Sequence, residues 1–261
     1  MGRLPDLADP RRFTEFVQWR KLHDRAPHHG ALMDKIAAKE IAGAALGADW
    51  ITPTLWAGTA LPARMPFALP AIVKARHGCN QNAVLRHPLP AWRWAALRLR
   101  ARQWMAARYG YWLDEGAYAE TPRGLMAKPL LDGGGGALPV DYKIYVFGGQ
   151  ATHIQVHLDR RAGRHRWVLH DRDFGPLVPG PERPARPASL AAMLAAAETL
   201  AARESFCRAD FNEIDGRPRF GEFCLYPGSG LDRFAADWID RELADLWRAA
   251  LTRHTQTQFL G

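Results

Sequence analysis

Residues 207–225 read CRADFNEIDGRPRFGEFCL, and this stretch decides the fold. Apolar residues lie on both sides of Asp215-Gly216, a dipeptide that favours a tight turn between antiparallel strands. The pattern predicts one strand over residues 207–214 and a returning strand over residues 219–225.

Two acids of this hairpin form a candidate metal site. In a tight hairpin, Asp210 and Glu222 project onto one face of the sheet, and Arg208 shares that face because it lies two residues from Asp210. Two convergent carboxylates suit Mg²⁺, a hard cation that also binds phosphate oxygens. An arginine beside them can stabilise charge on a transferred phosphoryl group. The alternative is a surface hairpin with ordinary charged residues.

A second group of strands lies upstream of this hairpin. Residues 141–147 alternate in character, Gly148-Gly149 predicts a turn, and residues 151–158 predict the return strand, with a third strand at 167–169. Lys143 stands among aromatic strand residues. Either it is partly buried and holds an anionic partner, or it lies on the polar face of an amphipathic strand.

The N-terminal half contains lysines that can meet an anion. Residues 31–47 predict one helix with Asp34 as its cap, and Lys35 and Lys39 lie four residues apart on one face of it. A short strand is predicted to follow at residues 51–56.

A buried strand at residues 71–73 ends at Lys74 and enters the polar loop 76–82, which has one glycine. A lysine and backbone N–H groups in this arrangement can hold phosphates. The loop lacks the spacing of a Walker A motif. A solvated lysine at a strand end is the alternative.

Three further helices are predicted, at residues 91–109, 190–203 and 236–252, the second capped by Ser189. The first is rich in arginine and tryptophan. We interpret it as a core helix of a small subdomain; the alternative is a helix that lies on a membrane.

Composition restricts the class of protein. The chain has 261 residues, 48% hydrophobic and 24% charged, which is typical of a soluble globular protein. Lysine and arginine exceed aspartate and glutamate by 35 to 27, a net charge of +8 that indicates an anionic partner. No apolar run is long enough for a transmembrane helix, and the start has no apolar core of a secretory signal. Three scattered cysteines predict neither a disulfide framework nor a cysteine-only zinc site, and indicate the reducing cytoplasm.

The segments alternate between helix and strand, which predicts an α+β or α/β fold. Four glycines at 133–136 predict a flexible boundary. We predict an N-terminal helical segment at 1–60, a small subdomain with the phosphate loop at 61–132, and a large subdomain with the metal hairpin at 133–261.

Six groups of residues between about Met33 and Leu246 resemble, in their order, the ATP-grasp superfamily and its TupA-like branch, which is named for teichuronopeptide biosynthesis. They are Met33-Asp34-Lys35 with Lys39, Ile72-Val73-Lys74 with His77-Gly78, Trp104-Met105, Asp141-Tyr142-Lys143 with Phe147-Gly148-Gly149, Arg208-Ala209-Asp210, and Gly221-Glu222-Phe223 with Pro227-Gly228-Ser229-Gly230.

The resemblance implies an α+β ATP-grasp fold with mostly antiparallel sheets, in which two subdomains grip ATP. It implies that Asp210 and Glu222 bind Mg²⁺, that Arg208 faces the transferred phosphoryl group, and that Lys143 is a catalytic lysine on the ATP side. The other residues implied for ATP binding are Lys35, Lys39, Lys74, His77, Gly78, and Lys128 and Leu130 of the adenine hinge.

Three positions depart from the family pattern. Lys128 stands where the hinge usually carries an acid. Cys224 stands where Asn or Thr often follows the glutamate by two residues, and a thiol is a poor ligand for Mg²⁺, which puts a second metal ion in question. The phosphate loop is poor in glycine, and residues 80–82 offer polar side chains instead.

The resemblance implies a ligase that joins a carboxylate to an amine through an acyl phosphate, in the biosynthesis of a surface polysaccharide or peptide-glycan. The acceptor would be an anionic glycan, a uronic acid or a peptide. Arginine recognises carboxylates well, so we predict that Arg160, Arg166 and His170, with Ser229, line the acceptor site; a solvated hairpin is the alternative.

Two other functions stay open. One is a phosphotransferase of the same fold that acts on a sugar hydroxyl. The other is a non-catalytic relative whose basic surface binds a glycan or another polyanion; nucleic acid is disfavoured because no helix-turn-helix, zinc-finger or RRM signature occurs. The expected location is the cytoplasm, with peripheral contact at the inner membrane face as a further expectation.

Overall fold

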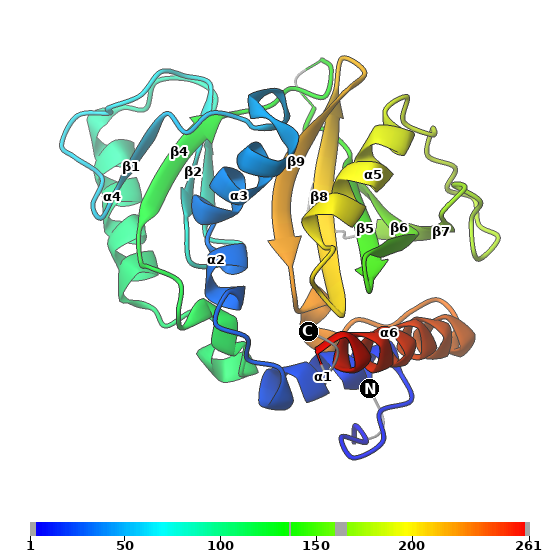
Figure 1. Ribbon diagram of the computed structural model, residues 1–261. Coiled ribbons are helices and arrows are strands. Elements are labelled where there is room, and N and C mark those ends of the chain that lie inside the picture. Colours follow the sequence, from blue (N-terminus) through cyan, green and yellow to red (C-terminus); the bar gives the residue numbers. More distant parts are fainter. Residues whose placement is uncertain (1–3, 136, 160–165, 259–261) are drawn as a thin grey trace. The chain divides into compact units, whose positions relative to one another are not determined.

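The computed structural model of the protein describes residues 4–135, 137–159 and 166–258 (Figure 1). The chain forms two compact units. The small unit is residues 26–132, and the large unit is residues 1–25 with residues 133–261. Residues 1–25 and 26–60 thus fall in different units, whereas the sequence prediction kept 1–60 as one segment. The predicted three-part division into domains stays a prediction.

The small unit contains a four-stranded antiparallel sheet in the order β1–β4–β2–β3. One face of this sheet presents Val73, Ala75 and Ala127, which pack with Trp94 and Leu97 of helix α4 in a buried apolar core. The predicted core helix is therefore confirmed. The elements are α2 (His29–Met33), α3 (Ala37–Leu46), η1 (Ala48–Trp50), β1 (Trp56–Gly58), β2 (Ala71–Ala75), β3 (Asn82–Leu85), α4 (Ala91–Ala106), η2 (Tyr111–Leu113), η3 (Gly116–Tyr118) and β4 (Leu125–Pro129).

The prediction of a single helix over residues 31–47 is wrong, because the chain turns at Asp34. The Asp34 carboxylate accepts the backbone N–H of Ile36 at 3.0 Å and the Arg76 Nε–H at 2.8 Å. These bonds separate α2 from α3. The strand predicted at 51–56 is placed too early, since residues 52–55 are not in a strand and β1 runs from Trp56 to Gly58.

The large unit contains a five-stranded antiparallel sheet in the order β7–β6–β5–β8–β9. Helix α5 contacts β5, β6 and β8 and covers one face, on which Ile144, Ile154, Ala209 and Phe211 are buried (Figure 1). The elements are α1 (Phe13–His23), β5 (Asp141–Phe147), β6 (Gln150–Asp159), β7 (Arg166–Asp171), α5 (Leu190–Leu200), β8 (Phe206–Ile214), β9 (Arg217–Cys224), η4 (Pro227–Gly230) and α6 (Asp237–Gln258).

Helices α1 and α6 pack on each other at one end of this sheet. Arg20 of α1 is fully buried there, and its guanidinium carbon lies 4.5 Å from the centre of the Trp247 ring. Its Nη1 donates to the Phe206 carbonyl at 2.8 Å, and its Nε donates to Asp24 at 2.9 Å. Because a buried charge is costly unless it is paired and hydrogen-bonded, this satisfied arginine fixes α1 to the large unit.

Candidate functional site

The face of the large sheet opposite α5 carries a cluster of charged side chains. The register pairs Lys143 on β5 with Asp210 on β8, and Asp210 with Glu222 on β9. Side chains of paired residues in an antiparallel sheet project to the same side. The predicted hairpin is confirmed, and it brings Asp210, Glu222 and Arg208 to one face as the sequence indicated.

Asp210 is the centre of this cluster. Its two carboxylate oxygens accept the Arg208 Nε–H at 2.7 Å and the Arg208 Nη2–H at 2.9 Å, and Lys143 Nζ forms an ion pair with the same carboxylate. Lys143 Nζ also lies 3.7 Å from Asp141 Oδ2, whose other oxygen accepts the Asn212 amide at 2.7 Å. Asp210, Lys143 and Arg208 are all buried, so these interactions are shielded from water.

A β-bulge at Gly221 sets this arrangement. The register shifts between Asp210 and Phe211, so that Gly221 is the extra residue on β9. A Cβ atom at Gly221 would lie 2.9 Å from the backbone oxygen of Asp210, which leaves no room for a side chain. The bulge keeps Glu222 beside Asp210 on the charged face and Phe220 on the opposite, apolar face.

The donor set of this cluster fits a hard divalent cation. Asp141, Asp210 and Glu222 supply three carboxylates, against the two basic side chains of Lys143 and Arg208. The excess of one carboxylate accommodates a cation, and carboxylate oxygens are the ligands that Mg²⁺ prefers. Cys224, which pairs with Arg208 across the hairpin, offers a soft sulfur that does not suit Mg²⁺.

Asp141, Tyr145 and Gln155 were not predicted as part of the site. Asp141 lies two residues before Lys143 on a strand, so the period of two was the signal that could have found it. Tyr145 OH donates to Gln155 Oε1 at 2.9 Å, and burial raises the pKa of Tyr145. These two residues come from β5 and β6, and their pairing depends on the sheet register.

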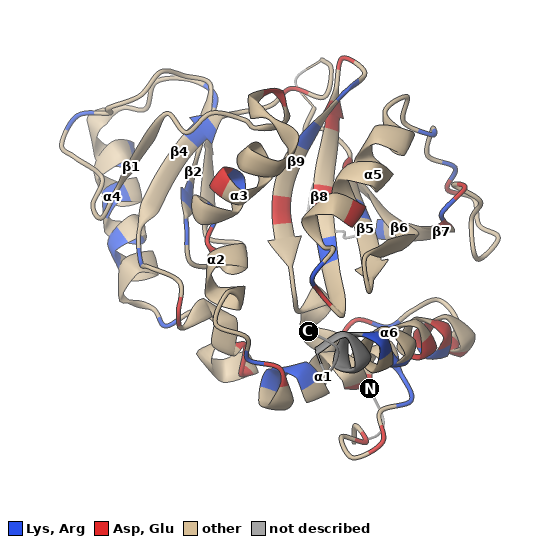
Figure 2. Ribbon diagram, in the orientation of Figure 1, with Lys and Arg blue, Asp and Glu red and all other residues tan. Residues whose placement is uncertain are grey.

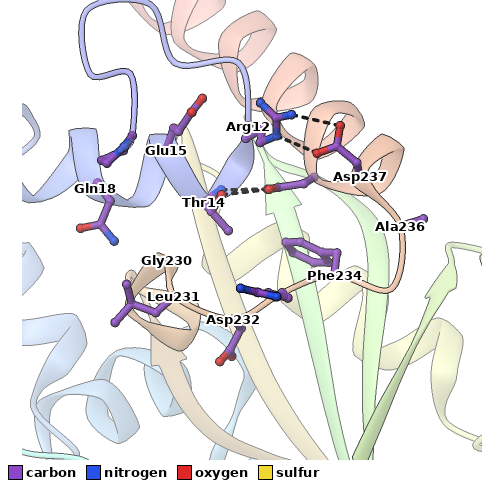
Figure 3. A pocket seen from close by; sticks show the side chains of 13 residues that line it. Arg12, Thr14, Glu15, Gln18, Gly230, Leu231, Asp232, Phe234, Ala236 and Asp237 are labelled. Carbon is purple, nitrogen blue, oxygen red and sulfur yellow. Dashed lines mark hydrogen bonds and ion pairs between the residues drawn. The ribbon is translucent and has the colours of Figure 1, made fainter. Parts of the chain in front are cut away.

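A cavity of about 780 Å³ opens on the large unit beside α1 and the segment 230–240 (Figure 3). Thr14, Asp232 and Phe234 line this cavity and also line a smaller inner space of about 10 Å³. The inner space is lined in addition by Tyr145, Gln155, Trp167 and Arg208, so it reaches the charged cluster. We call the two spaces together the α1 pocket.

The small unit places two lysines on the face of its sheet opposite α4. Lys74 pairs with Met126, and Ile72 pairs with Lys128, so Lys74 and Lys128 project to the same side. Lys39 of α3 lies close enough to Lys74 to be repelled by it. Burial, with a contribution from the Lys74 charge, lowers the pKa of Lys39 to about 8. The Lys39 ammonium donates to Thr54 Oγ1 at 3.2 Å.

Lys35, His77 and Gly78 hold the loop that follows β2. Lys35 Nζ donates to the Gly78 carbonyl at 2.7 Å. His77 is buried, with Nε2 at 3.2 Å from the Trp104 carbonyl and Nδ1 at 3.3 Å from the Gly124 amide. Leu130 of the expected hinge donates its backbone N–H to the Pro70 carbonyl at 3.1 Å. These contacts place the residues around the loop and hinge; their predicted roles toward ATP stay predictions.

Of the residues predicted for the acceptor, the three that the structure describes do not come together. Arg166 is exposed and forms an ion pair with Glu182, and His170 pairs with Ile154 on the α5 side of the sheet, away from Asp210. Ser229 Oγ accepts the Lys21 ammonium at 2.8 Å. Arg160 lies outside the described residues.

Comparison with solved structures identifies the fold. The D-alanine–D-alanine ligase from Bacillus anthracis is similar to this chain with a TM-score of 0.52 and 14% identity, over 87% of this chain and 69% of that one. The same enzyme complexed with ATP is similar with a TM-score of 0.51 and 14% identity, over the same shares of the two chains. No curated protein sequence matches this one.

The two antiparallel sheets with their helices form the ATP-grasp fold, as the sequence resemblance implied. Within this class, residues 136–248 match the family model described as TupA-like ATPgrasp. The matched segment contains β5 to β9, and with them Lys143, Arg208, Asp210 and Glu222. The predicted resemblance to the TupA-like branch is thereby confirmed over the strands of the large sheet.

Proposed function

We propose that this protein is an ATP-dependent ligase that uses Mg²⁺ and joins a carboxylate to an amine through an acyl phosphate. The observation that carries the proposal is the buried cluster of Lys143, Arg208 and Asp210 beside Glu222 on one sheet face. Buried opposite charges arranged around a carboxylate pair suit the transfer of a phosphoryl group, which depends on positioning and on charge neutralisation.

In this proposal the lysines of the small unit bind the phosphates of ATP. Lys39 and Lys74 are two neighbouring cations whose mutual repulsion a bound polyphosphate would relieve. Lys128 projects from the same sheet face as Lys74. Asp210 and Glu222 would hold Mg²⁺, which when bound neutralises charge on the phosphate oxygens.

The reaction proposed has two steps. A carboxylate oxygen of the acceptor attacks the γ-phosphorus of ATP, ADP leaves, and an acyl phosphate forms. An amine then attacks the acyl carbon, phosphate leaves, and an amide remains. Arg208 neutralises the transferred phosphoryl group, and Lys143 exchanges its ion pair with Asp210 for one with phosphate oxygens.

We assign the acceptor to the α1 pocket, because its inner end is lined by Arg208. This assignment differs from the predicted set of Arg160, Arg166, His170 and Ser229, of which Arg166 and His170 belong to the edge strand β7. Thr14, Asp232 and Phe234 are the pocket residues shared by its outer and inner parts. An anionic glycan, a uronic acid or a peptide stays the proposed acceptor, on the strength of the TupA-like match.

The proposed biological role rests on the same match to the TupA-like family model. We propose a role in the biosynthesis of a surface polysaccharide or peptide-glycan, in the cytoplasm or at the inner face of the membrane. Of the helices in the described ranges, none has the length and apolar character that a membrane span requires.

The test is thermal unfolding of the natural protein with ATP and Mg²⁺ together and with each alone. Ligand at about 100 Kd stabilises by about 2.7 kcal/mol, which for a chain of this size shifts Tm by roughly 5–10 °C. We expect the Tm of the natural protein to rise only when ATP and Mg²⁺ are both present. In Lys74→Met we expect no rise. In Glu222→Gln we expect the rise with ATP to be independent of Mg²⁺. The absence of a shift at millimolar ATP would refute nucleotide binding.

Release of ADP then separates the reaction types. A ligase releases ADP with a carboxylate acceptor and forms the amide only when an amine is added, whereas release with a sugar hydroxyl as acceptor would indicate a phosphotransferase. Phe234→Ala is expected to raise the KM for the acceptor with the ATP-induced Tm shift unchanged, and Trp238→Ala, at an exposed position of α6, is its control.

A further inference from the structure

Helix α4 has two apolar faces, and the small unit buries only one of them. Trp94, Leu97 and Ala101 face the core. On the opposite side of the helix, Trp92 is 67% exposed and Leu99 is 59% exposed. These two residues are seven apart and therefore lie one above the other along the outward face.

Arginines border this outward stripe on both sides. At 100° per residue, Arg93 and Arg100 lie along one flank, and Arg98 and Arg102 lie along the other. Helix α4 carries no acidic residue (Figure 2). The acid-free stretch is longer than the helix, because residues 50–113 contain nine lysines and arginines and neither aspartate nor glutamate.

A groove of about 510 Å³ adjoins the stripe, lined by residues of α4 and of the edge strand β3. Its apolar lining includes Val84 and Leu89, and Arg93 and Arg100 line it as well. Arg100 donates to the Asn82 carbonyl at 2.8 Å, which holds its guanidinium at the groove. Arginine in such a place binds phosphate with good geometry.

We propose that the outward face of α4, with this groove, docks the protein onto an anionic membrane surface. Trp92 and Leu99 insert among the lipids at the level of the headgroups, and the flanking arginines bind lipid phosphates. An apolar stripe bordered by cations is the pattern of helices that lie in a membrane interface, and basic residues near an anionic leaflet are attracted to its surface.

The charges and the apolar residues disfavour two other occupants. A second copy of the chain would bring two acid-free basic faces together in a symmetric contact, where like charges repel. Single-stranded nucleic acid is bound by successive aromatic rings that stack on successive bases, whereas on this face Trp92 stands beside the aliphatic residues Leu99 and Val84. The inference does not rest on the proposed ligase activity.

The experiment is flotation with vesicles of phosphatidylcholine, with or without phosphatidylglycerol. We expect the natural protein to float only with the anionic vesicles, less so as salt is raised, because salt screens surface charges. Arg93→Glu with Arg102→Glu is expected to weaken binding at least tenfold, and Trp92→Ser to weaken it several-fold. Matched controls on the large unit, Arg183→Glu with Arg186→Glu and Trp238→Ser, are expected to bind nearly as the natural protein does.

Three results would overturn the proposal. The first is that the α4 variants and their matched controls float equally well. The second is that the protein binds single-stranded RNA but not anionic vesicles. The third is a dimer in size-exclusion chromatography that Trp92→Ser dissociates, while no variant floats. The ATP-induced Tm shift of each variant is measured in parallel. A retained shift shows that the variant is folded, and it separates failure of membrane docking from failure of nucleotide binding.

Discussion

Arg208 and Asp210 lie two residues apart on β8 and form a buried ion pair through two hydrogen bonds, from Nε at 2.7 Å and from Nη2 at 2.9 Å. Lys143 pairs with the same carboxylate from the neighbouring strand. The Asp210 carboxylate therefore pairs with two buried cations, one of which, Lys143, also lies 3.7 Å from Asp141. The arrangement ties the stability of the large sheet to the residues that we propose for phosphoryl transfer.

Replacing Asp210 with alanine is expected to destabilise the protein by about 3–5 kcal/mol, because removal of one partner leaves the other buried charges uncompensated. The measurement is urea unfolding at pH 7. Asp210→Asn, which keeps the shape and part of the hydrogen bonding, is expected to lose less.

The matched control for this prediction is Asp173→Ala. Asp173 belongs to the same unit and is exposed, so its replacement is expected to change stability by no more than about 0.5 kcal/mol. Equal losses in Asp210→Ala and Asp173→Ala would show that the buried ion pair contributes nothing.

Lys39 is expected to lower the free energy of unfolding of the ligand-free protein, although we propose that it binds the phosphates of ATP. Its pKa of about 8, lowered by burial and then by Lys74, is below the value near 10.4 of a lysine in an unfolded chain. Between these two values the unfolded state binds more protons, so stability rises with pH through this window. We expect Lys39→Met to remove that rise and to stabilise the ligand-free protein at pH 7 by at least about 1 kcal/mol.

The measurement is urea unfolding of both proteins between pH 7 and pH 10, together with the ATP-induced Tm shift. Lys39→Met is expected to reduce that shift, since one cation for phosphate is gone. A stability difference that does not vary with pH would contradict the titration of Lys39 in this window.

The hairpin 207–225 could be predicted from sequence because its signals are local. The Asp215-Gly216 turn determines the pairing near the turn, from Ile214 with Arg217 to Phe211 with Phe220, whereas Asp210 pairs with Glu222 only because of the bulge. The pattern was less informative at Gly221, where the bulge shifts the register by one residue.

Other parts depend on contacts that the local pattern does not contain. Helix α1 was not predicted, because it buries charged residues, and two of them, Arg20 and Lys21, donate to residues about 200 positions away in the sequence. Ser189 does precede α5, but its hydroxyl donates to Glu213 and makes no cap of the helix. The α1 pocket joins residues about 200 positions apart in the sequence, which no spacing rule brings together.

Protonation of His153 is expected to destabilise the protein in acid. His153 is buried on β6, with Nε2 at 3.6 Å from Glu242 of α6, and burial lowers its pKa to about 4 against an opposing effect of Asp171. The unfolded state binds more protons between pH 4 and about pH 6.5, so stability is lost as pH falls through that window.

His153→Gln is expected to lose roughly 2 kcal/mol less stability than the natural protein between pH 7 and pH 4. Urea unfolding at several pH values measures this difference. His87→Asn, at an exposed position on the small unit, is the control and is expected to follow the natural protein. If both variants keep the acid sensitivity of the natural protein, another group is responsible for it.

Cys224 faces the cluster at the position across from Arg208 and supplies a thiol where a hard cation needs oxygen. The adjacent strand already holds the carboxylate of Asp210, so one added oxygen ligand on β9 completes a larger donor set. We expect Cys224→Asn to lower the Mg²⁺ concentration that half-saturates the ATP-induced Tm shift by several-fold. Cys224→Ser tests a smaller oxygen ligand at the same position, and Cys224→Ala, which offers no ligand, is expected to behave as the natural protein does. An equal Mg²⁺ requirement in all four proteins would place the metal ion away from this end of β9, and would leave Asp210 and Glu222 as its ligands.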